Sequence, residues 1–133
     1  MKQLTTLLLL IAAAVPLGAK WKTKEKRFDP VAITDARQIV GRYVGIDPDF
    51  AVELRVSDSG IIAGTMRSFG TNATLTSIHI DGADLTAMAD GLPLHATFVT
   101  RVKNGQRAFG LLVHDADVQI DDVTLTQIFC ARK

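Results

Sequence analysis

Three histidines are the side chains in this 133-residue chain best suited to acid–base or metal chemistry: His79, His95 and His114. None of them belongs to an H-x-H or H-E-x-x-H pair, and no C-x-x-C accompanies them, so the sequence carries no metal signature. His79 and His95 fall on strands of neighbouring predicted hairpins and could approach each other. They are then either a metal or catalytic pair or two ordinary strand histidines.

Acidic residues gather just after the third histidine, at Asp115, Asp117, Asp121 and Asp122. Clustered carboxylates are what calcium requires, but the D-x-D-x-D-G spacing of a calcium loop is absent, which favours a solvated acidic turn. No serine lies in G-x-S-x-G or S-x-x-K, and no glycine-rich phosphate loop is present. We therefore predict no catalytic, cofactor-binding or metal-ligating residue. The sequence does not exclude an enzyme, but it indicates no reaction class.

One cysteine, Cys130, excludes an intramolecular disulfide and a cysteine metal cluster. It lies near the end of an apolar strand, which favours a small buried residue over a reactive thiol.

The elements that must position these side chains are strands. Phe50, Val52, Leu54 and Val56 alternate with polar or small residues, and strict alternation indicates a strand with one buried face. The same reasoning predicts strands near 41–46, 50–57, 61–68, 73–80, 84–89, 94–102, 107–113 and 123–131, with a short extended piece at 118–120. Asp-Gly and Asn-Gly pairs between apolar runs indicate tight hairpins. The predicted fold is all-β, an eight-stranded antiparallel up-and-down meander or small barrel.

A short N-terminal helix is expected over Thr34–Val40, with Thr34 as its N-cap and Gly41 ending it. Its apolar side would close one end of the sheet structure.

The first 19 residues resemble a secretory signal peptide, with Lys2, an apolar run from Leu4 to Val15 and a small-residue ending. The run is shorter than the roughly 20 residues that a spanning helix needs. We expect export, to a periplasmic or extracellular location. The basic residues that follow act against export, since positive charge beside an apolar segment tends to stay cytoplasmic.

Residues 20–33 form a basic lead segment without a consistent period, expected to be solvated and mobile. The alternative is contact with an anionic membrane or an envelope protein, with Trp21 at the interface. The basic residues available for that contact are Lys20, Lys22, Lys24, Lys26 and Arg27. The formal net charge of the whole chain is only +1, which argues against a general nucleic-acid binder.

The helix leading into Gly41-x-Tyr43 and then an eight-strand meander resembles the calycin group of lipocalin-like barrels. In that group a Gly-x-Trp opens the first strand and an Arg or Lys near the last strand covers the aromatic ring. Here Tyr43 replaces the Trp, and Arg132 is the candidate cover. The resemblance covers residues 34–133, the single barrel domain, and its size suits a small lipocalin-like barrel. It implies a barrel and an apolar ligand.

An eight-stranded barrel is just wide enough to be filled by side chains or to hold one small ligand. We expect Leu54 and Phe109 to face one core. The residues expected to point inward are Phe50, Leu54, Met66, Phe98, Phe109, Leu111, Leu125 and Phe129. They predict a mostly filled interior with a shallow mouth, and hence a non-catalytic protein that binds a small apolar ligand. The alternative function is an accessory module that docks on an envelope protein or membrane.

Overall fold

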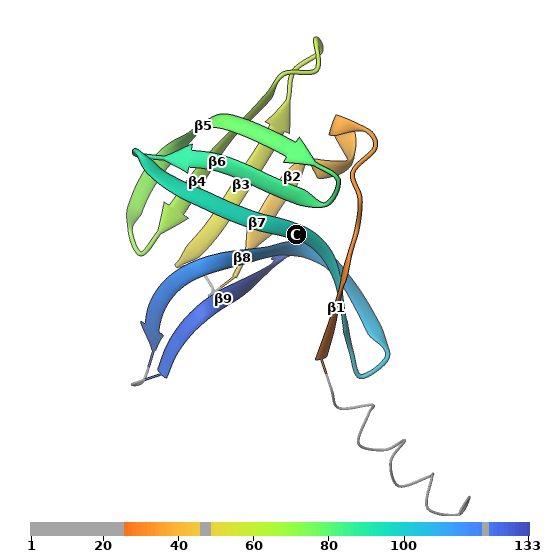
Figure 1. The fold of residues 1–133 in the computed structure, drawn as a ribbon, viewed down its shortest axis with the longest axis vertical. Helices are drawn as coiled ribbons and strands as arrows, with labels where there is room; N and C mark the ends of the chain where they lie inside the picture. The colour runs from red at the N-terminus through yellow and green to blue at the C-terminus, as the bar shows by residue number, and fades with distance from the viewer. Residues whose placement is uncertain (1–25, 46–48, 121–122) are drawn as a thin grey trace, which may run out of the picture.

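Alternating apolar and polar residues become nine antiparallel strands in the computed structural model of the protein (Figure 1). The structure describes residues 26–45, 49–120 and 123–133, and only the backbone at residues 26, 115–120 and 123–125. The expected signal peptide and most of the basic lead, including Lys20, Lys22 and Lys24, lie outside the described residues.

The elements follow one another in this order: β1 (Lys26–Pro30), the 3-10 helix η1 (Ala36–Ile39), β2 (Gly41–Val44), β3 (Phe50–Val56), β4 (Ile62–Ser68), β5 (Thr71–Asp81), β6 (Asp84–Ala89), β7 (Leu92–Lys103), β8 (Gln106–Ile120) and β9 (Val123–Arg132). From β2 onward each strand pairs with the next along the chain, and β9 pairs back with β2 through Tyr43–Arg132 and Val44–Ala131. The eight strands β2–β9 thus form a closed antiparallel barrel, which confirms the predicted fold class.

Tight turns set the registers of the hairpins. Both residues of Asp90-Gly91 have positive φ, 52° and 80°, and so do both residues of Asn104-Gly105, at 54° and 80°. Two left-handed residues in a two-residue loop match the right-handed twist of the flanking strands. The hairpins expected at these two dipeptides are confirmed.

One face of each strand fills the barrel. On β3, Phe50, Val52 and Leu54 are buried while Glu53 and Arg55 between and beyond them are exposed. Phe109 packs against the same core as Leu54, as expected. The fully or nearly fully buried residues of this core are Ile39, Tyr43, Phe50, Val52, Leu54, Leu75, Leu85, Ala87, Leu94, Ala96, Phe98, Leu111, Val113, Ile128 and Cys130.

The end of the basic lead is a strand, which the sequence did not predict. Lys26–Pro30 forms β1 and pairs with the second half of β7, from Val99 to Lys103. β6 pairs with β7 only as far as Thr97, so that edge of β7 is free for another strand. The sequence KRFDP carries no alternation of its own. Its extended form follows from the unpaired edge that it covers.

Strand β8 is longer than predicted. Residues 114–122 were expected to connect two strands, but β8 continues to Ile120, and its register with β9 shifts between His114 and Val118. An irregularity of this kind lets a strand bend without ending. Separately, no helix in the described parts of the chain is both long and apolar enough to cross a membrane.

The expected inward position of Phe129 is wrong. Ile128 and Cys130, its neighbours on β9, belong to the barrel core, so Phe129 lies on the outer face. Its ring centroid lies 5.6 Å from that of Phe28 on β1. The pairing of β1 gives this part of the sheet a second, outer apolar layer, and period-two alternation alone does not reveal which face points inward. The side chain of Leu125 lies outside the described residues.

Candidate functional site

The two ends of the barrel differ because antiparallel strands place alternate turns at opposite ends. One end is closed by η1, whose Ile39 is fully buried. The Tyr43 hydroxyl, also buried, donates to the Ile39 carbonyl at 2.6 Å, and Arg132 Nη1 donates to the Gln38 carbonyl at 2.7 Å. These bonds satisfy carbonyl groups at the end of the short helix and hold it across the barrel.

Tyr43 and Arg132 are brought together as register partners on β2 and β9. The guanidinium of Arg132 lies 4.5 Å from the centroid of the Phe109 ring, and that ring centroid lies 6.3 Å from that of Tyr43. Burial raises the pKa of Tyr43, and the neighbouring Arg132 charge and hydrogen bond partly offset that rise. The arginine therefore covers an aromatic cluster at the closed end rather than Tyr43 alone. The family role of the pair stays a prediction.

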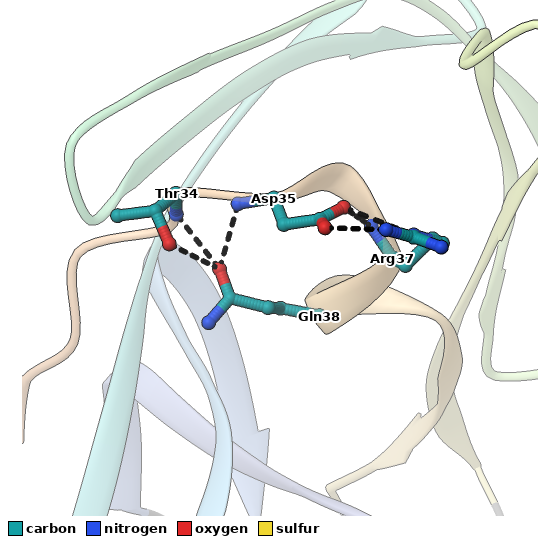
Figure 2. A network of polar contacts seen from close by, with 4 residues as sticks. All are labelled: Thr34, Asp35, Arg37 and Gln38. Atoms are coloured by element: carbon teal, nitrogen blue, oxygen red, sulfur yellow. Dashed lines mark hydrogen bonds and ion pairs between the residues drawn. The ribbon is translucent and has the colours of Figure 1, made fainter.

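A capping box fixes η1 at its start (Figure 2). The N-cap is Asp35 and not the predicted Thr34: its carboxylate accepts from the Arg37 backbone N–H at 2.9 Å. Gln38 Oε1 accepts from the backbone N–H groups of Thr34 and Asp35 at 2.7 and 2.9 Å. Hydrogen bonds from Arg37 lower the pKa of Asp35 to about 2, so the cap stays ionised.

The opposite end of the barrel is an open mouth. A cavity of about 290 Å³ lies inside the turns at 69–70 and 90–91. Its apolar lining comes from Phe50, Met66, Ala73, Ala89, Leu92, Pro93, Leu94 and Val113, and its polar lining from Ser68, Thr71, Asp90 and His114. An apolar floor with a few polar groups at its edge is the usual composition of a small-molecule site.

Two exposed apolar residues lie at this end of the barrel. Leu92, which lines the cavity, is 69% exposed, and Phe69, in the neighbouring turn and not among the lining residues, is 48% exposed. Phe69 also has a φ of 47°, a left-handed conformation that is costly for a bulky side chain, and its N–H donates to the Asp49 carbonyl at 2.7 Å. Strain of this kind concentrates at functional sites. Our sequence reasoning missed Phe69, although a phenylalanine directly before Gly70, where a turn residue would be usual, was a visible signal.

The histidine pair on the outer surface differs from the one considered from sequence. Register places Thr86 between His79 and His95, whereas the rings of His95 and His114 lie 4.8 Å apart. His114 Nε2 lies 2.8 Å from Thr97 Oγ1, and that hydroxyl donates to Asp84 Oδ1 at 3.1 Å.

These distances set the direction of the hydrogen bonds. Because the Thr97 proton goes to the Asp84 carboxylate, the hydroxyl accepts from His114 Nε2–H, and His114 Nδ1, 3.0 Å from Gln127 Nε2, accepts from that amide. With this tautomer, His114 donates to the Thr97 hydroxyl.

The remaining candidates for chemistry are Cys130 and groups of side chains that could bind a metal ion. Cys130 is fully buried, and burial raises the pKa of its thiol to about 12, which keeps it protonated and unreactive. Where the side chains are described, no group of three or more His, Cys, Asp or Glu residues could hold a metal ion. The acidic side chains of residues 115–122 lie outside that set.

Comparisons with protein-family models, with curated proteins and with solved structures found no match for this chain.

Proposed function

We propose that the protein is a non-catalytic binding protein that holds a small apolar ligand at the mouth of its barrel. The observation that carries this proposal is the apolar cavity at the open end, whose lining includes the exposed Leu92. The closed end, with its buried Tyr43 and Ile39, leaves the mouth as the natural entrance to the barrel. The shared layout supports membership of the lipocalin-like group, as a small barrel with Tyr43 in place of the usual Trp.

The size of the cavity limits the ligand. Its volume of about 290 Å³ is close to the lower limit of about 300 Å³ for ordinary small-molecule pockets. Below it, Phe50, Leu94 and Val113 are already packed with the core, so a long chain cannot run into the interior. The ligand is therefore compact, and micromolar affinity is expected because much of it stays in contact with water.

The test is a fluorescence titration with the neutral dye 1-aminoanthracene, competed by small apolar alcohols. We expect saturable one-to-one binding that is lost in Ala73→Trp, because the indole fills the mouth from β5. Ala63→Trp, on the exposed outer face of neighbouring β4, is the matched control and should bind normally. Equal loss in both variants, or nanomolar binding of long fatty acids, would contradict a shallow mouth.

Our proposal also includes export of the protein and a role for the basic lead segment. The protein is proposed to act in the periplasm or outside the cell, which a mature N-terminus near residue 20 in the native protein would support. Docking on an anionic membrane or envelope protein through Lys20, Lys22, Lys24, Lys26 and Arg27 is the second candidate. The observation that favours it is β1, which joins the end of this lead to the barrel.

A further inference from the structure

We propose that the cleft at the tip of the β7–β8 hairpin is a binding site for a phosphate group, held by Arg101 and Lys103. The cleft has a volume of about 420 Å³, and its other lining residues are Asn104, Gln106, Arg107 and Ala108. Since the turn at 104–105 lies at the opposite end of the barrel from the mouth, the site is independent of the apolar ligand proposed above.

The charge of this hairpin contrasts with that of the rest of the barrel. Residues 100–108 contain three basic residues and no acid, whereas residues 28–133 contain nine basic and thirteen acidic residues. A local concentration of positive charge on an acidic protein attracts anions without making the whole molecule a polycation.

The basic residues that line the cleft also have no acidic partner among the described residues. Arg27, Arg37 and Arg55 each form an ion pair with an acid two positions away in the sequence. Arg101 and Arg107 have no acid at that spacing, and in the described part of the chain neither they nor Lys103 takes part in an ion pair. Their charge is therefore available to a ligand.

Arg101 is held in place before any ligand arrives. Its guanidinium carbon lies 4.5 Å from the centroid of the Phe129 ring, which in turn packs against Phe28. Its Nε is buried and has no hydrogen-bond partner among the described residues. A guanidinium fixed by stacking loses little freedom on binding, and its planar fork matches the oxygens of a phosphate.

The register of the hairpin decides which cations share a face. Arg101 pairs with Ala108 and Lys103 with Gln106, whereas Arg107 pairs with Val102 and so extends from the opposite face. The amides of Asn104 and Gln106 supply neutral donors beside Arg101 and Lys103. Two cations with amide donors suit the dianion of a phosphate monoester, either a soluble ester or a lipid headgroup.

The experiment uses the chain as purified from its host, with three probes: inorganic phosphate, glycerol 3-phosphate, and vesicles of phosphatidylcholine with and without phosphatidic acid. Calorimetry measures the first two and co-sedimentation the third. Lys103→Gln changes only an exposed side chain, so its fold should be unaffected. Arg101→Lys keeps the charge but loses the stacked fork. The matched control is Arg67→Gln, an exposed arginine in a cleft that also contains Glu53.

We expect Lys103→Gln to weaken binding about tenfold, Arg101→Lys to weaken it less, and Arg67→Gln to leave it unchanged. Affinity should fall as salt rises. Binding of glycerol 3-phosphate without vesicle binding assigns the site to soluble esters, and binding that needs phosphatidic acid assigns it to lipid. The proposal is overturned if no probe binds saturably, or if Arg67→Gln weakens binding as much as Lys103→Gln does.

Discussion

At the scale of single residues, Phe69 carries the most information about function. The turn that it occupies with Gly70 has positive φ at both positions, 47° and 88°, a geometry for which Asn-Gly is the preferred sequence. The phenyl side chain is about half exposed, so it gains only part of the stabilisation that full burial gives. We propose that this residue serves ligand binding at the neighbouring mouth.

Replacing Phe69 by Asn should therefore separate stability from binding. We expect Phe69→Asn to raise the free energy of unfolding by up to about 1 kcal/mol, since the left-handed conformation costs ordinary residues roughly 1–2 kcal/mol. The same change should weaken binding of the dye by removing an apolar side chain from the turn beside the mouth. Chemical denaturation and the dye titration measure the two effects. Ile61→Asn, another exposed apolar residue at the other end of the barrel, is the control and should leave dye affinity unchanged.

At the scale of elements, the sequence predicted strands and hairpins well because their signals are local. Alternation on β3 and the Asp-Gly and Asn-Gly turns depend only on neighbouring residues. Strand β1 could not be predicted in this way, since its extended form depends on an open edge of β7 about seventy residues later in the chain. The sequence placed Phe129 on the wrong face of β9 for the same reason. Its contact on the outer face is Phe28, which belongs to β1.

Gly110 on β8 tests this outer layer. A Cβ at this position would overlap the Cys130 carbonyl oxygen and lie 2.9 Å from the Phe129 ring, so both the backbone and the ring would have to move. We expect Gly110→Ala to destabilise the protein by about 1–3 kcal/mol, as overpacking does. Denaturant unfolding measures this. A matched Ala108→Gly variant, on the same face but only partly buried, should cost less; a stability of Gly110→Ala equal to wild type would show that the ring does not lie against this strand.

At the scale of the whole molecule, the barrel separates two kinds of surface. One end carries the closing helix, Arg132 and the basic hairpin, and the other carries an apolar mouth. The filled interior agrees with the prediction from sequence. That prediction needed only the number of large inward-facing side chains and the small volume inside an eight-stranded barrel. The position of the mouth could not be predicted from sequence. It depends on which turns lie at the same end of the barrel and on how wide an opening they leave between them.

The most direct test of ligand binding at the mouth is a methyl NMR titration with 1-aminoanthracene. We predict saturable shifts for Met66, Leu94 and Val113, which line the cavity, and none for Ile39 and Leu85 at the closed end. Shifts confined to the closed end or to the outer face around Leu112, or shifts that never saturate, would contradict the account.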